Sequence, residues 1–157
     1  HLIREPEVDP RAQAFIRESV RAVEGTNYTM HFQDGNPMLG IALAEALDRG
    51  EVVAMQGDRP RTGGKTVATT LFGRPFEVPA GPAALARVAN VPMLPVFAIR
   101  AGRRHFRLVF GAPIQVARSR HRDADIAGAS EVMVREIEAA IRRAPHQWFV
   151  FRALWPQ

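Results

Sequence analysis

Residues 46–59 read ALDRGEVVAMQGDR, and this stretch decides the fold prediction because it passes from a helix into a strand and then into a charged turn. The helix is predicted to begin at Asn36, a capping residue followed by a proline, and to end at Gly50. Residues 52–55 form a short apolar run, as expected for a strand in a sheet that is covered on both faces. Residues 57–64 are typical of a loop in composition.

Helices alternate with strands on both sides of this stretch. The spacing of apolar residues predicts further helices over 10–23, 83–89 and about 130–143, and strands over 27–32, 67–72, 92–100 and 106–110. This order predicts an α/β fold with a mixed, mostly parallel sheet flanked by helices. We expect one domain, residues 1–157, truncated at its N-terminus because Leu2 and Ile3 read as the tail of a strand. The polar segment 116–128 is predicted to be a surface loop.

Charge and composition exclude several classes of protein. The formal net charge is +5, and Lys65 is the only lysine among 21 basic residues. Arginine binds phosphate through planar, bidentate contacts, although an arginine-rich codon bias explains the same excess. There is no cysteine, so disulfides are excluded. No apolar run approaches the roughly 20 residues of a membrane span, and the first residues do not resemble a signal peptide.

The common catalytic and metal-binding motifs are absent from the sequence. The histidines are scattered, and the one acidic cluster beside a histidine, at His121, lies in the predicted surface loop. Gly64-Lys65-Thr66 resembles the end of a phosphate-binding loop, but Arg59 stands where the first glycine is required. No metal site is therefore predicted.

Two stretches are candidates for ligand binding. Asp58, Arg59 and Arg61 follow the predicted strand 52–55, and ligands of open α/β sheets bind beyond the carboxyl ends of strands. An ordinary turn would explain the same residues. Gly81 opens a predicted helix, whose free N–H groups can hold an anion, although a purely structural junction explains that position equally.

Five blocks, taken in order, resemble the lipid A biosynthesis acyltransferases, the lauroyl and myristoyl transferases. The first is the quoted stretch, and the second is Leu71-Phe72-Gly73. The others are the residues 81–86 (GPAALA), the residues 91–96 (VPMLPV), and the ending with Glu136 and residues 141–148 (IRRAPHQW). His146 departs from the family pattern, which has Glu there. The resemblance covers essentially the whole chain.

The resemblance implies transfer of a fatty acyl group from acyl carrier protein or acyl-CoA to a hydroxyl of a phosphorylated glycolipid. It implies no cofactor, a location at the cytoplasmic face of the bacterial inner membrane, and no nucleic-acid partner. Arg59, with Arg61, is expected to hold a substrate phosphate or the developing oxyanion, and Asp58 to fix the loop or the arginine. Gly81 is expected to line the same cleft, and Arg4 and Arg17 match basic positions of the family.

The family's catalytic motif, a histidine followed five positions on by an acidic residue, is not found. The residues at that distance from the five histidines are Pro6, Asn36, Phe110, Ile126 and Phe151. We therefore expect the catalytic histidine and a membrane anchor to lie upstream, and this chain alone not to catalyse acyl transfer.

Other functions remain open on the sequence alone. Glycerol-phosphate and phosphatidylinositol-mannoside acyltransferases share the Gly-Pro and Pro-x-x-Pro-Val blocks. A non-catalytic homologue would also lack the motif. A basic nucleic-acid-binding module would need exposed aromatic residues, whereas Phe106 and Phe110 alternate as predicted core residues. Exposed arginines of the second half are candidates for contact with anionic lipid or with the acidic carrier protein: Arg103, Arg104, Arg118, Arg120 and Arg122.

Overall fold

The computed structural model describes residues 1–22, 28–32, 36–59, 63–150 and 153–155. Contacts divide the chain into two units, residues 1–56 and residues 57–157. The described residues form a mixed α/β structure with three two-stranded sheets. Only one of these sheets is parallel, so the predicted mostly parallel sheet is not confirmed.

The first unit contains a short parallel sheet and two helices. Strand β1 (Leu2–Arg4) pairs with β2 (Met30–Phe32). Helix α1 (Pro10–Arg21) begins where Asp9 accepts a hydrogen bond from the backbone N–H of Arg11, and α2 spans Leu39–Asp48. Both helices were predicted. Residue 27, the expected start of β2, and residue 23 lie outside the described residues.

The quoted stretch forms less regular structure than predicted. Residues 52–55 make a single parallel bridge, between Ala54 and Leu2, instead of a strand. Val52 is 76% exposed, so the prediction of a strand covered on both faces is wrong for the described structure. An apolar run alone does not form a strand unless neighbouring strands pair with it. Gly50 ends the α2 segment with a φ of 79°, as its position in the sequence predicted.

The second unit begins with a hairpin that the sequence pattern only half revealed. Strand β3 (Thr66–Leu71) pairs with β4 (Arg74–Pro79) in antiparallel register through a two-residue turn. Phe72 and Gly73 of this turn have φ values of 52° and 73°, as a type I′ turn requires. β3 was expected from the sequence, whereas β4 was not predicted.

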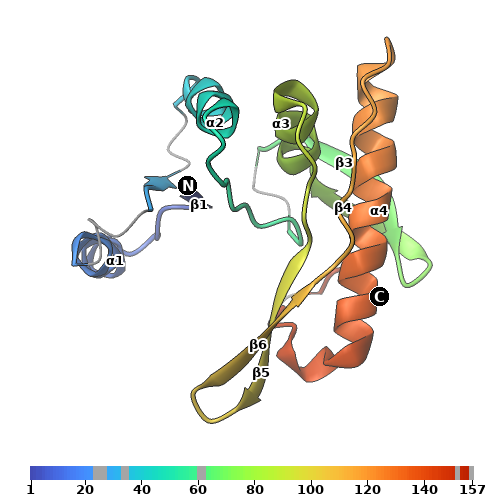
Figure 1. The fold of residues 1–157 in the computed structure, drawn as a ribbon. Helices are drawn as coiled ribbons and strands as arrows, with labels where there is room; N and C mark the ends of the chain where they lie inside the picture. Colours follow the sequence, from blue (N-terminus) through green and yellow to red (C-terminus); the bar gives the residue numbers. More distant parts are fainter. Residues whose placement is uncertain (23–27, 33–35, 60–62, 151–152, 156–157) are drawn as a thin grey trace. The chain divides into compact units, whose positions relative to one another are not determined.

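A long helix, α4 (Arg122–Arg143), carries the core of this unit (Figure 1). It packs against β3 and against α3 (Gly81–Ala89). The buried cluster contains apolar side chains of α4, of both strands of the β3–β4 hairpin and of α3: Leu71, Phe76, Val78, Ala83, Ile126, Ala129, Met133, Val134, Ile137 and Ile141. Ile114 completes the buried set.

Helix α4 begins eight residues before the predicted start at Ser130, so the surface loop predicted over 116–128 is partly wrong. The reason lies in Asp125, which was expected in a solvated loop but is buried in the first turns of the helix. Asp125 also accepts hydrogen bonds from the backbone N–H and the hydroxyl of Ser119. Negative charge near a helix N-terminus is stabilising. The segment was predicted to be a loop because it is rich in charged residues, and the start of α4 was therefore missed.

The last hairpin was predicted correctly in position but not in burial. Strand β5 (Val96–Gly102) pairs with β6 (His105–Phe110) in antiparallel register. Phe106 and Phe110 are exposed, which corrects the prediction that they are core residues. The argument against a nucleic-acid-binding surface that rested on their burial therefore does not hold.

Candidate substrate-binding site

Asp58 and Arg59 lie beside each other and are held by the end of the chain. The Nε of Arg59 is 3.1 Å from Oδ2 of Asp58. The indole Nε1 of Trp148 donates to the same oxygen over 3.3 Å, and Nη1 of Arg59 donates to the carbonyl oxygen of Phe149 over 3.3 Å. All four residues belong to the second unit. Two segments about ninety residues apart thus meet at one carboxylate and one guanidinium.

This arrangement orients Arg59 while leaving it accessible. Its side chain is 42% exposed, whereas that of Asp58 is 24% exposed. The two terminal nitrogens of the guanidinium carry four N–H donors, and only one of them, on Nη1, donates to a described residue, Phe149. The other three remain for a ligand, and Nη2 forms no hydrogen bond with the described residues. A guanidinium fixed on one side and open on the other is suited to an incoming oxyanion.

The residue before Trp148 fixes a neighbouring strand. The backbone N–H of Arg100 donates to Oε1 of Gln147 over 2.7 Å, and Nε2 of Gln147 donates to the carbonyl oxygen of Arg100 over 3.1 Å. The side-chain amide therefore pairs with the β5 backbone as an adjacent strand would. Gln147 and Trp148 stand in the short helix η1 (Pro145–Gln147) and directly after it, so one turn of chain joins β5 to the Asp58 loop.

The remaining predicted site residues are not brought to this point by any recorded contact. Gly81 lies at the start of α3, and among the described residues nothing joins it to Asp58 or Arg59. Arg4 forms an ion pair with Glu7, and the guanidinium of Arg17 lies 5.3 Å from the ring centre of Phe32, both within the first unit. Arg61 lies outside the described residues.

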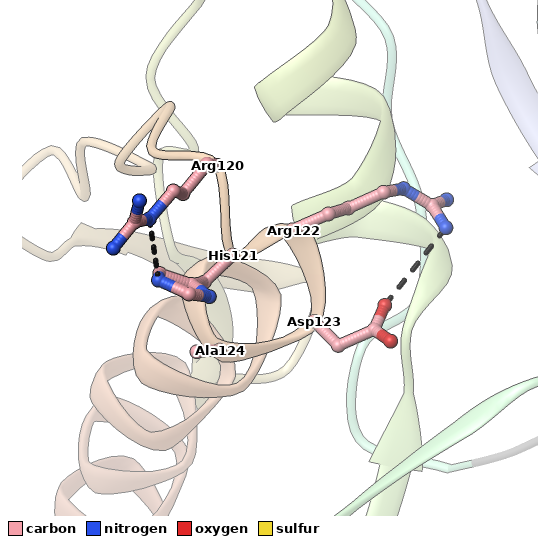
Figure 2. Close-up of a pocket in the computed structure, with 5 residues that line it drawn as sticks. All are labelled: Arg120, His121, Arg122, Asp123 and Ala124. Atoms are coloured by element: carbon pink, nitrogen blue, oxygen red, sulfur yellow. Dashed lines mark hydrogen bonds and ion pairs between the residues drawn. The ribbon is translucent and has the colours of Figure 1, made fainter.

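A second concave region lies at the start of α4, and Figure 2 shows the side chains around it. Its lining residues are consecutive in the chain and all exposed: Arg120, His121, Arg122, Asp123 and Ala124. Nε of Arg120 lies 3.1 Å from Nε2 of His121, so these polar groups contact one another. This open surface does not indicate a bound ligand. In the described parts of the chain no group of three or more histidine or carboxylate side chains is arranged to hold a metal ion.

Comparison of the sequence with models of known protein families shows which family the chain belongs to. The sequence model of the bacterial lipid A biosynthesis acyltransferases matches residues 20–157. The chain belongs to this family. No curated protein matches the sequence. The resemblance drawn from the five sequence blocks is therefore confirmed, and family membership indicates acyltransferase activity in lipid A biosynthesis. Helices among the described residues are too short or too polar to cross a membrane.

The sequence pointed to Asp58 and Arg59 but not to the groups that hold them. Gln147 and Trp148 were noticed as part of the closing block, which was used only to recognise the family. That block was the one feature of the sequence that could have indicated these residues, because it places two side chains with hydrogen-bond donors directly after a long helix. Nothing in the sequence, however, indicates which residue ninety positions earlier the indole N–H contacts.

Proposed function

We propose that this chain supplies the substrate-holding part of an acyltransferase. The reaction is transfer of a fatty acyl group from acyl carrier protein or acyl-CoA to a hydroxyl of a phosphorylated glycolipid such as a lipid A precursor. Family membership supports the class of reaction. The half-exposed Arg59, fixed by Asp58 and by the Phe149 carbonyl, is the observation that supports the substrate role.

Arg59 has the chemistry to hold a phosphate or a developing oxyanion. Its contact with Asp58 reduces the local positive charge, but it also fixes the guanidinium before a ligand arrives, so less side-chain entropy is lost on binding. Asp58 is in this proposal a positioning residue, and Trp148 positions Asp58 in turn. Arg61 and Gly81, at the start of α3, are proposed to contribute to the same anion site. Arg4 and Arg17, which belong to the first unit, are proposed to bind substrate as basic positions of the family.

The remaining parts of the proposal concern fold, base and location. A mostly parallel sheet of the glycerol-phosphate acyltransferase type is supported by the β1–β2 pairing, whereas the two antiparallel hairpins do not support it. The catalytic histidine is proposed to lie outside residues 1–157, since no His-x4-Asp/Glu occurs within them. We place the protein at the cytoplasmic face of the inner membrane, where its acceptor would be found.

Arg59→Ala is expected to weaken the binding of glucosamine 1-phosphate by about tenfold or more, because hydrogen bonds to charged groups are the stronger kind. The chain has only two tryptophans, and Trp148 contacts Asp58, so Trp148 fluorescence in a Trp155→Phe background reports binding at the site. Glucosamine without phosphate should give no signal. Arg135→Ala, which removes an exposed arginine of α4, is the matched control. Equal affinity of the Arg59 and Arg135 variants would remove Arg59 from the site.

The chain alone is expected to show no acyl transfer from a lauroyl carrier-protein thioester to a phosphorylated glycolipid. The physical reason is the missing general base, without which the acceptor hydroxyl stays a weak nucleophile. The measurement is product formation by mass spectrometry against a heat-denatured sample of the chain. Turnover above that control would show that a base lies within residues 1–157 and would contradict this part of the proposal.

A further inference from the structure

One face of the β5–β6 hairpin is apolar and exposed. The register places three cross-strand pairs on this face: Val96 with Phe110, Ala98 with Leu108, and Arg100 with Phe106. Exposed fractions are 47% for Val96, 65% for Phe106, 58% for Leu108 and 60% for Phe110. Exposed aromatic and aliphatic side chains gathered on one strand face mark a binding surface more often than scattered ones do.

The same hairpin is strongly basic. Residues 96–110 contain four arginines and one histidine and no acidic residue. Arg103 and Arg104 form the tip, which in Figure 1 projects away from α4. Arg104 has a φ of 63°, a conformation that glycine or asparagine adopts more easily than arginine. Position 104 at the tip thus carries an arginine although the backbone conformation there favours glycine or asparagine.

The opposite side of the hairpin is anchored, so the exposed face is held in place. Phe97 and Val109 point to that side and line a small cavity together with Ala139 and Ala140 of α4, and Phe110 also borders this cavity. Gln147 pairs with the backbone of Arg100 on the outer edge of β5. A hairpin fixed on one side presents its other side without a further cost of ordering.

We infer that the exposed face of the β5–β6 hairpin docks on an anionic lipid surface. Phenylalanine and leucine side chains enter the boundary between headgroups and acyl chains, while the arginines of the tip pair with lipid phosphates. An acidic protein would satisfy the arginines but would leave the apolar face without a partner. A nucleic acid would stack on the aromatic rings but gains little from Val96 and Leu108.

This inference rests on the proposed membrane location, but it is tested by vesicle binding and not by acyl transfer. Loss of glucosamine 1-phosphate binding in the Arg59 variant would leave the hairpin result untouched, and the reverse also holds. The two proposals therefore succeed or fail separately.

The test is flotation of the 157-residue chain with vesicles of phosphatidylglycerol and phosphatidylethanolamine, compared with vesicles of phosphatidylcholine alone. We expect binding to the anionic vesicles that weakens as salt is raised. Each basic residue near an anionic surface contributes about fivefold to the partition, so the double variant Arg103→Gln, Arg104→Asn should bind about thirtyfold less. Asparagine suits the left-handed backbone at position 104, so this variant is expected to fold.

Two further variants separate the contributions. Phe106→Thr with Leu108→Thr replaces two apolar side chains by a β-branched residue that suits a strand, and it should also reduce binding strongly. Arg135→Gln removes one charge from the exposed side of α4 and should leave binding within about twofold of the unchanged chain. Circular dichroism spectra confirm that each variant is folded.

Several results would overturn the inference. Equal flotation with neutral and anionic vesicles, or equal binding of the tip variant and the Arg135 variant, excludes the proposed contact. Binding to a single-stranded oligonucleotide or to an acidic carrier protein without binding to vesicles assigns the face to another partner. Dimerisation that the Phe106 and Leu108 substitutions abolish assigns it to a second copy of the chain.

Discussion

Leu71→Ala is expected to lower the free energy of unfolding of the second unit by about 3 kcal/mol. Leu71 ends β3 and is 0% exposed, within the cluster that also contains Val134 and Ile137 of α4. Its truncation removes buried apolar surface and leaves a cavity that the surrounding strand and helix cannot fill completely. No other residue of the strand is buried to this extent.

Urea denaturation followed by tryptophan fluorescence measures this loss. Trp148 and Trp155 are the only tryptophans and both lie in residues 57–157, so the signal follows that unit. Thr70→Val, a change at the exposed neighbouring position of β3, should alter the free energy of unfolding by less than about 0.5 kcal/mol. An unfolding midpoint for Leu71→Ala equal to that of Thr70→Val would mean that β3 does not pack on α4.

Asp125→Ala is expected to lower the thermal midpoint of the second unit by several degrees. The carboxylate accepts from Nε of Arg87 over 2.9 Å and from the backbone N–H and hydroxyl of Ser119 over 2.9 Å and 2.8 Å. The side chain of Arg87 is only 17% exposed. Removal of the carboxylate therefore leaves a largely buried cation and two further donors without this acceptor.

The acid dependence of this effect has a definite sign. Burial raises the pKa of Asp125, but the hydrogen bonds from Ser119 and Arg87 outweigh it and hold the pKa below its ordinary value. The unfolded chain then binds a proton more readily than the folded one, so the contribution of Asp125 is present at neutral pH and is lost as the pH falls below about 5. The difference between the variant and the unchanged chain should accordingly shrink in acid.

Asp123→Ala provides the control for this prediction. Asp123 lies in the same first turn of α4, so it has the same relation to the helix dipole, but its side chain is 97% exposed. Differential scanning calorimetry at pH 7 and at pH 3 should show a larger loss for Asp125→Ala at pH 7 than at pH 3 and little change for Asp123→Ala at either pH. Equal losses for the two variants would mean that the helix dipole, and not the Arg87–Ser119 contacts, explains the effect.

Local patterns predicted most of the helices and three of the four hairpin strands, β3, β5 and β6, correctly. Helix α1 begins at Pro10 directly after the capping Asp9, and α3 begins with Gly81 and Pro82, because helix starts depend on neighbours in the sequence. Glu138 and Arg142 stand four residues apart in α4, a spacing that favours an ion pair, and the structure contains this pair at 2.7 Å. The corresponding pair of Glu131 and Arg135 is not recorded among the described residues.

The elements that the sequence patterns missed depend on contacts between residues far apart in the chain. Two residues, Phe72 and Gly73, separate two runs of alternating apolar and polar residues, which is the pattern of a hairpin. The pattern was not recognised as a turn because phenylalanine is uncommon at positive φ. In the structure the backbone N–H of Phe72 donates to Glu138 over 2.7 Å, and Arg142 lies over its ring, so a helix far along the chain supports this turn. The start of α4 was missed for the same reason, because Asp125 is buried only when Arg87 is beside it.

The sequence by itself determined the family and the order of most elements, because motifs, caps and periodicity are properties of neighbouring residues. It also singled out Asp58 and Arg59 as candidate site residues, which remains a prediction. The tertiary structure alone decided that Trp148 and Phe149 hold this pair, and that the apolar side chains of β6 are exposed. Alternation in a strand tells which side chains share a face. Which of the two faces is covered depends on what packs against it, and that is set by contacts between residues far apart in the chain.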